Sequence, residues 1–206
     1  MKKTVFWFVV LCVLAAAVWG VLRYYSGTAS EDNLKEGDLI FHTSQSNQSP
    51  AIRYATGSAL SHCGIIIEKK DGLYVLEATH KLKLTPLQEF INRGKGGRWW
   101  AKRVVDEPVK IRYNGLLGRP YDMAFKRDNN LYYCSELIYD IYKKQLGIEL
   151  CPLRKVSSYN VLGVKKVLKR RGISLDQLVV APSDIFYSDK VHDVKAVGAS
   201  RSKPTN

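Results

Sequence analysis

Residues 61–79 read SHCGIIIEKKDGLYVLEAT. Two runs suited to β-strands, 61–68 and 73–79, flank the sequence KKDG at 69–72. Asp-Gly between two such runs is a strong signal for a β-hairpin, because both residues tolerate the positive φ angles that a tight turn needs. The sequence therefore predicts two antiparallel strands joined by a tight turn.

The hairpin also makes a prediction about His62 and Glu77. A turn of two or four residues makes the sum of the numbers of opposed residues odd, which places these two side chains on the same face. In one such register Glu77 lies opposite Gly64, whose missing side chain leaves room for the carboxylate to lean towards the imidazole. A three-residue loop would place the two side chains on opposite faces, so the prediction depends on the turn.

A second informative segment is CSELIYDIYKKQL at 134–146. Its apolar residues recur at helical spacing, and Gly147 follows as a C-terminal cap, so we predict a helix with Cys134 in its first turn. The N-terminus of a helix lowers the pKa of a thiol, and its free N–H groups can hold a developing oxyanion. Cys134 is thus a candidate nucleophile, with a buried core cysteine as the alternative.

The remaining segments indicate a mixed α+β domain. We expect a short strand at 39–41, a helical turn or two at 51–56 and a helix at 161–169. Thr85-Pro86 resembles an N-cap followed by a proline at the first helical position, which predicts a short helix over 83–93 after the hairpin. Further expectations are a loop at 94–97, strands at 99–105 and 109–113 (the second also compatible with a short helix), and turns at 118–122 and within 179–187.

The N-terminus has the order of a targeting segment. Lys2 and Lys3 precede an uncharged apolar run from Val5 to Leu22, which is long for a signal peptide and just long enough to span a bilayer. We predict a cleaved signal or an uncleaved membrane anchor over 1–30, and a domain that lies outside the cytoplasm, periplasmic or membrane-anchored. The folded domain is placed at 31–195 and a disordered tail at 196–206.

Charge and cysteine content narrow the function classes. Net charge is +13, which suits anionic partners such as lipid or cell-wall polymer. The export signal and the lack of an aromatic–basic RNA motif argue against nucleic acid. Of the four cysteines Cys12 belongs to the targeting segment, so the domain holds an odd number and at least one thiol without an intramolecular partner. Catalysis is one reason to keep a free thiol in an oxidising compartment.

Several motifs, in their order, resemble the YiiX-like permuted papain-like family of the NlpC/P60-related cysteine hydrolases. They are GDLIF at 37–41, LSHCGI at 60–65, LEA at 76–78, GRPYD at 118–122, YCSEL at 133–137 and APSDIF at 181–186. The resemblance covers nearly all of 35–190 and implies an α+β domain in which an antiparallel sheet packs with helices and the histidine strand precedes the cysteine helix. It also implies Cys134 as nucleophile, His62 as base and Glu77 as the residue that orients His62.

Other candidates carry weaker predictions. Tyr121 and Ser135 are proposed to contact substrate. The alternative for Tyr121 is a residue that caps its turn, and the alternative for Ser135 is an ordinary first-turn serine. Gln45 is a weak candidate for an oxyanion donor. Cys63 follows His62 on a strand, so it points to the other face and is expected in the core.

We expect no cofactor and no metal. A metal site built from His62, Cys63, His80 or Cys134 is disfavoured, because no close pair of these ligands has zinc-like spacing. The sequence thus predicts a thiol hydrolase or acyl transferase that cleaves an amide or ester bond, in a cell-wall peptide or a lipid. The alternative is a non-catalytic ligand-binding module built on the same cleft. The oligomeric state is left open.

Overall fold

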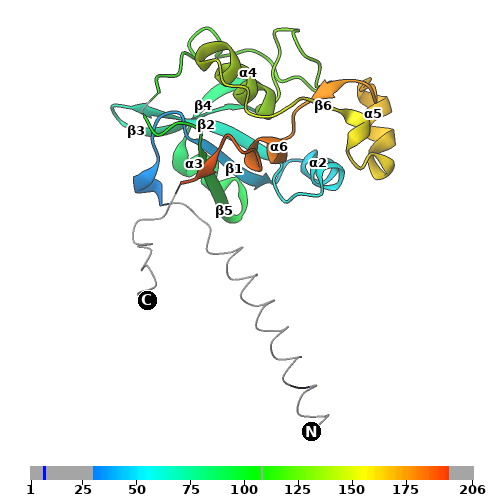
Figure 1. The fold of residues 1–206 in the computed structure, drawn as a ribbon, viewed down its shortest axis with the longest axis horizontal. Helices are drawn as coiled ribbons and strands as arrows, with labels where there is room; N and C mark the ends of the chain where they lie inside the picture. The colour runs from blue at the N-terminus through cyan, green and yellow to red at the C-terminus, as the bar shows by residue number, and fades with distance from the viewer. Residues whose placement is uncertain (1–6, 8–29, 108, 195–206) are drawn as a thin grey trace.

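The computed structural model describes Trp7, residues 30–107 and residues 109–194 (Figure 1). The predicted targeting segment therefore lies outside the described residues except for Trp7 and Ser30, and the predicted tail 196–206 lies outside them entirely. Within the described residues, no helix is both long enough and apolar enough to cross a membrane.

A six-stranded antiparallel sheet forms the centre of the fold, in the order β4-β3-β2-β1-β5-β8. Its strands are β1 (Leu39–Ser44), β2 (His62–Lys69), β3 (Gly72–Ala78), β4 (Leu82–Pro86), β5 (Gly94–Arg103) and β8 (His192–Asp193). Two short strands, β6 (Arg154–Lys155) and β7 (Leu178–Val179), pair separately.

The helices lie on both sides of the sheet and at one end of it (Figure 1). They are α2 (Ser49–Thr56), α3 (Leu87–Asn92), α4 (Cys134–Leu146), α5 (Lys165–Arg171) and α6 (Pro182–Phe186). Short 3-10 turns are η1 (Glu31–Asn33), η2 (Val156–Ser158) and η3 (Leu162–Val164).

The alternation of side chains along β1 and β2 divides the core in two. Leu39, Phe41 and Ile65 face α4, whose apolar residues cover this side of the sheet. Ile40 and Ile66 face the opposite side, which α3 covers. Two buried layers of this kind, one on each face of a sheet, are the expected way to remove both faces from water.

The predicted hairpin is confirmed. Lys69 pairs with Gly72 and Ile65 with Leu76, which leaves a turn of two residues between β2 and β3. This register places Glu77 and His62 on the same face, as predicted for a turn of two residues. Gly64 is needed here, because a Cβ at this position would lie 2.3 Å from Cγ1 of Val75 and 2.8 Å from the carbonyl oxygen of Leu76.

Two predictions near the hairpin are wrong. Residues 82–86 form strand β4, paired with β3 through Leu76 and Leu84, and the helix begins only at Leu87. Pairing at the open edge of β3 overrides the capping pattern. Residues 94–97 are not a loop, because β5 begins at Gly94 and pairs with β1.

Residues 109–113 form neither a strand nor a helix. The N–H of Ile111 donates to Oε1 of Glu36 at 3.0 Å, and the N–H of Arg112 donates to Oε1 of Gln145 at 2.9 Å. Side chains thus satisfy this backbone, and a strand partner is not required.

Two C-terminal predictions need smaller corrections. The helix expected over 161–169 is a 3-10 turn followed by α5, which ends at Arg171. The turn expected within 179–187 contains the short helix α6, which begins at Pro182, and the Asp184 carboxylate accepts the Ala181 N–H at 2.7 Å. This contact satisfies one of the backbone N–H groups at the start of the helix.

Candidate active site

The structure brings together the three residues predicted to carry catalysis. His62 is the first residue of β2, and its Nε2 lies 2.6 Å from Oε2 of Glu77. Cys134 is the first residue of α4, and its buried thiol is close enough to the His62 ring for each group to shift the pKa of the other. Because Nε2 faces Glu77, Nδ1 is the nitrogen left for Cys134. The imidazole thus lies between a carboxylate and a thiol.

The electrostatics of the site favour a charged pair. The pKa of the Cys134 thiol lies well below its ordinary value, because a hydrogen bond from Cys63 and the nearby His62 outweigh burial. Burial alone would lower the pKa of His62, but hydrogen bonds with Cys134 and Glu77 raise it to about 9. Between these two pKa values the site holds a thiolate beside an imidazolium, the form in which a cysteine is a nucleophile.

Glu77 is completely buried and is held by three partners. Besides His62, the Thr85 hydroxyl and Nη2 of Arg93 both donate to its Oε1. Burial would raise the pKa of Glu77, but His62, Thr85 and Arg93 lower it to about 2. Between about pH 2 and pH 9, Glu77 is therefore a carboxylate beside a protonated His62.

A second buried histidine packs against the first. His42 pairs with His62 across β1 and β2, and their ring centroids lie 5.3 Å apart. His42 also stacks on Phe90 at 4.3 Å and 14°, and the ring of Phe90 lies 5.7 Å from that of His62. Burial, and next the charge of His62, lower the pKa of His42 to about 3, so it stays neutral. The buried ring of His42 packs against the ring of His62 and limits its rotation.

Cys63 lies in the core, on the α4 face, as its place next to His62 predicted. The Cys63 thiol is the first cause of the lowered pKa of Cys134, and burial raises the pKa of Cys63 well above its ordinary value. Cys63 thus keeps its proton and donates it towards Cys134. The alternation of side chains along the strand predicted correctly that Cys63 lies in the core, but it did not predict that Cys63 affects Cys134.

An apolar pocket of about 820 Å³, its open mouth included, adjoins Cys134. Residues from α2, from 156–173 and from 179–182 surround it. The apolar side chains of its wall include Ala51, Ile52, Ala55, Phe125, Val156, Val161, Val164, Val167, Leu168, Ile173 and Val179. The few polar groups around it include Gln48, Tyr121 and Arg171. The pocket is therefore suited to an apolar ligand with its reactive end at Cys134.

Tyr121 and Ser135 both line this pocket. The phenolic oxygen of Tyr121 accepts a hydrogen bond from Nε2 of Gln48 at 3.1 Å, and Arg171 donates to Oε1 of Gln48 at 3.3 Å. The phenol hydrogen of Tyr121 is thereby left for another acceptor. The Ser135 hydroxyl donates to the Val180 carbonyl at 2.7 Å, so it ties α4 to the 179–182 segment.

Gln45, the weak candidate for an oxyanion donor, does not line this pocket. Its amide nitrogen donates to the carbonyl oxygens of Arg93 and Gly94 at 3.2 and 3.5 Å. This amide group is therefore committed to the backbone at the start of β5 and not to an oxyanion.

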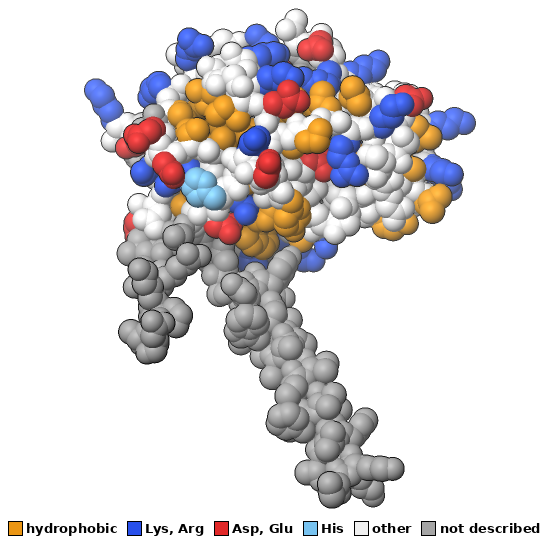
Figure 2. Space-filling view, in the orientation of Figure 1, with side chains coloured by type: hydrophobic (Ala, Val, Ile, Leu, Met, Phe, Trp, Pro, Cys, Tyr) orange, Lys and Arg blue, Asp and Glu red, His pale blue; other side chains and the backbone are white. Residues whose placement is uncertain are grey.

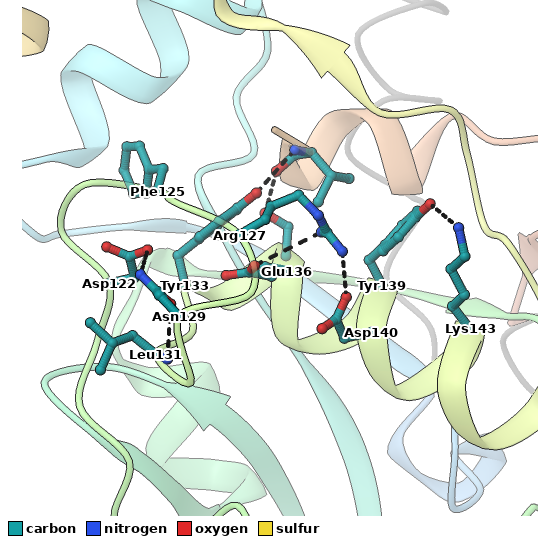
Figure 3. A network of polar contacts seen from close by, with 12 residues as sticks. Asp122, Phe125, Arg127, Asn129, Leu131, Tyr133, Glu136, Tyr139, Asp140 and Lys143 are labelled. Atoms are coloured by element: carbon teal, nitrogen blue, oxygen red, sulfur yellow. Dashed lines mark hydrogen bonds and ion pairs between the residues drawn. The ribbon is translucent and has the colours of Figure 1, made fainter. Parts of the chain in front are cut away.

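A polar network fixes the start of α4 (Figure 3). Arg127 lies between two acidic residues of the helix, 2.8 Å from Asp140 and 3.9 Å from Glu136. Burial, and next the charge of Asp140, raise the pKa of Glu136 to about 8. The Tyr133 hydroxyl accepts the Val180 N–H at 3.1 Å. These contacts hold the first turn of α4, and hence Cys134, against the rest of the domain.

Asp122 belongs to the loop that precedes α4. One of its oxygens accepts the Ala124 N–H at 2.8 Å and the other accepts Nδ2 of Asn129 at 2.9 Å. Asp122 is therefore a buried residue that closes the loop before α4.

Sequence reasoning missed Thr85, Arg93, His42 and Gln48. Thr85 and Arg93 were assigned to one helix, whereas Thr85 lies on β4 and Arg93 follows α3. A strand at 82–86 would have placed Thr85 diagonal to Glu77, since Glu77 pairs with Lys83. His42 lies one residue beyond the strand predicted at 39–41, and no local pattern marks Gln48.

Known proteins resemble this chain in sequence and in fold. Residues 33–195 match a family described as permuted papain-like amidase enzymes, the YaeF/YiiX or C92 family. The uncharacterised protein YiiX of Escherichia coli (strain K12) is 33% identical over 162 residues, which is 73% of this chain and 80% of that protein. A crystal structure of yiiX from Escherichia coli O157:H7 superposes with a TM-score of 0.71 at 29% identity, covering 80% of this chain and 98% of that one.

That crystal structure is described as one of a metalloprotein. Among residues 30–107 and 109–194 of the present chain, no group of three or more His, Cys, Asp or Glu side chains has an arrangement that could hold a metal ion. The described residues therefore do not fit a metal site.

The fold is confirmed by these comparisons, since the histidine strand β2 precedes the cysteine helix α4 and the crystal structure of a relative has the same architecture. The family match spans more than three quarters of the chain. The chain belongs to the permuted papain-like amidase family of YaeF and YiiX, and is a cysteine hydrolase.

Proposed function

We propose that the chain transfers an apolar acyl group, from an amide or an ester, to the Cys134 thiol and then to water or another acceptor. The observation that supports this is the apolar pocket that Cys134 helps to line. A thiolate in the wall of an apolar pocket receives the carbonyl carbon of an acyl chain that lies along the pocket.

The chemistry follows from the three residues described above. The Cys134 thiolate attacks the carbonyl carbon and a tetrahedral intermediate forms. The His62 imidazolium then gives its Nδ1 proton to the leaving amine or alcohol, and the carbon–heteroatom bond breaks to leave a thioester. Neutral His62 next takes a proton from the acceptor, whose oxygen or nitrogen displaces the thiolate. Glu77 keeps the ring oriented and stabilises its charge in both steps.

Two groups of donors are available for the oxyanion of the intermediate. The first N–H groups of α4 have no acceptor within the helix, and they lie beside Cys134. The phenol of Tyr121 is the second, because Gln48 already donates to its oxygen and leaves the O–H free to donate. We assign substrate contact to Tyr121 on this basis, and to the backbone of Ser135.

The pocket favours a lipid-like acyl group over a cell-wall peptide. Wall peptides carry charged and amide groups that would lose their hydration without partners on such a wall. An alkyl chain loses only apolar surface, which is favourable by about 25 cal/mol per Å². A cell-wall peptide would need a polar subsite along the same surface.

We place this activity outside the cytoplasm. The support is the sequence order of Lys2 and Lys3 followed by the uncharged run Val5–Leu22. The N-terminal segment would hold the domain near lipid if it is retained.

The test is to trap the thioester. The full chain is mixed with nitrophenyl esters of acetate and of dodecanoate, quenched in acid, and the acylated peptide is mapped by mass spectrometry. We expect acyl groups on Cys134, formed faster from dodecanoate. Ala55→Phe, which fills the pocket, is expected to slow the dodecanoate reaction about tenfold, equivalent to about 1.4 kcal/mol, while the acetate reaction serves as the internal control.

Two results would contradict the proposal. Equal effects of Ala55→Phe on both esters would show that the pocket does not receive the acyl chain. If neither ester acylated Cys134, the non-catalytic binding module would take the place of the enzyme.

A further inference from the structure

The segment 161–171, VLGVKKVLKRR, has two distinct faces. One face lines the pocket and comprises Val161, Val164, Val167, Leu168 and Arg171. The other points to solvent and comprises Leu162, Lys165, Lys166, Lys169 and Arg170, which we call the basic face. The spacing of both sets is that of a helix, so η3 and α5 together form one amphipathic element.

The basic face gathers its charges without acidic partners. In the described part of the chain, Lys102, Lys143 and Lys144 each pair with a carboxylate within 3 Å, whereas no ion pair involves a residue of the basic face. Residues 150–175 contain seven Lys or Arg and no Asp or Glu. A concentration of one sign of charge attracts a surface of the opposite sign.

Exposed apolar side chains accompany this charge. Leu162 is 73% exposed and Tyr54 is 48% exposed. The two lie close together, because a Cβ at Gly163 would be 2.6 Å from the ring of Tyr54. Figure 2 shows blue side chains, with orange ones among them, along the edge where Figure 1 places α5. Solvent-exposed lysines alone would not explain a leucine that protrudes from the same face.

We propose that the basic face docks on a bilayer that contains anionic phospholipid. The lysines contact the lipid phosphates, while Leu162 and Tyr54 enter the boundary between headgroups and acyl chains. A soluble polyanion would satisfy the charges but leave both apolar side chains in water, so a lipid surface fits better. Docking would also bring the pocket to the bilayer, because the opposite face of the same element lines it. The inference stands on charge and exposure and does not depend on the proposed chemistry.

The test uses the full chain reconstituted in vesicles. An environment-sensitive dye is placed on Leu162→Cys in a Cys12→Ser, Cys134→Ala background, in which the remaining thiols, Cys63 and Cys151, are buried. The vesicles contain phosphatidylcholine alone or phosphatidylcholine with phosphatidylglycerol. We expect the emission to shift to the blue only in the anionic vesicles, and the shift to disappear at high salt.

Charge variants decide whether the basic face is responsible. Lys165→Gln, Lys166→Gln and Lys169→Gln together should weaken docking about a hundredfold, since each lysine near an anionic surface contributes about fivefold. The matched control has the same loss of charge at three other exposed lysines, Lys70, Lys81 and Lys95, and should keep the shift.

Three outcomes would overturn the inference. They are no shift in anionic vesicles, an equal shift in zwitterionic vesicles, and an equal loss in the control variant. A shift caused by dextran sulfate without vesicles would assign the face to a soluble polyanion. Because no substrate turns over, none of these results bears on the acyl-transfer proposal.

Discussion

Replacing Glu77 with glutamine tests whether its charge maintains the imidazolium. The rise in the pKa of His62 from 6.5 to about 9 corresponds to about 3 kcal/mol in favour of the protonated ring. Cys134 and Glu77 share this effect, against the cost of burial. If Glu77 supplies about half, Glu77→Gln lowers the pKa of His62 by about one unit.

The assay is alkylation of Cys134 by iodoacetate between pH 4 and 10, with the modified peptide identified by mass spectrometry. This anionic reagent needs both the thiolate and the neighbouring positive charge, so its rate rises through the pKa of Cys134 and falls through that of His62. At pH 9 the protonated fraction of His62 should fall from about one half to about one tenth in the variant. The pH at which the rate of Cys134 alkylation falls should therefore be lower by about one pH unit in the variant.

Glu36→Gln is the matched control. Glu36 is another buried carboxylate, but its partners are Lys110 and the N–H of Ile111, away from His62. The reasoning is refuted if Glu77→Gln leaves the pH at which the rate falls unchanged, or if Glu36→Gln lowers it equally. Cys151, whose pKa burial raises to about 12, should stay unmodified across most of this range.

Three further predictions concern single side chains. Gly64→Ala should lower the free energy of unfolding in urea by about 1–3 kcal/mol through overpacking, whereas Gly115→Ala, with nothing within 4 Å of the added Cβ, should be nearly neutral. Because the folded pKa of Glu136 is raised from 4.5 to about 8, stability should decline as pH rises from 4.5 through 8, by up to about 5 kcal/mol, and Glu136→Gln should remove this dependence in urea titrations. Cys63→Ala should raise the pH at which Cys134 alkylation begins, because it removes the first cause of the lowered pKa of Cys134, and Cys63→Ser should restore part of the effect.

The sequence predicted those parts of the site that depend on short-range order. His62 and Glu77 are only fifteen residues apart and are joined by a hairpin with a two-residue turn, which places their side chains on the same face of the sheet. Cys134 begins a helix because the periodicity of 134–146 and the cap at Gly147 are local signals. In both cases a repeat of two or 3.6 residues determines where a side chain points.

Interactions between distant segments could not be found in this way. Strand β4 exists because it completes the edge of β3, although its own sequence resembles the start of a helix. The pocket is formed by α2 together with α5 and the segment 179–182, and α2 lies about 110 residues before the other two in the chain. No periodicity within one segment indicates which other segment will cover it.

Arg93, which the sequence analysis missed, changes the balance of charge at the site. The three predicted residues in their working forms are a carboxylate, an imidazolium and a thiolate, which together carry a net negative charge that a buried site would stabilise poorly. Arg93 adds the missing positive charge, so the charges alternate from Arg93 through Glu77 and His62 to Cys134. The guanidinium side chain is 37% exposed, so one end of this row is in contact with water. Four alternating charges therefore stabilise the buried thiolate. The outermost of them, Arg93, could not be identified from the sequence, because it lies beside the hairpin only when α3 and β5 are folded.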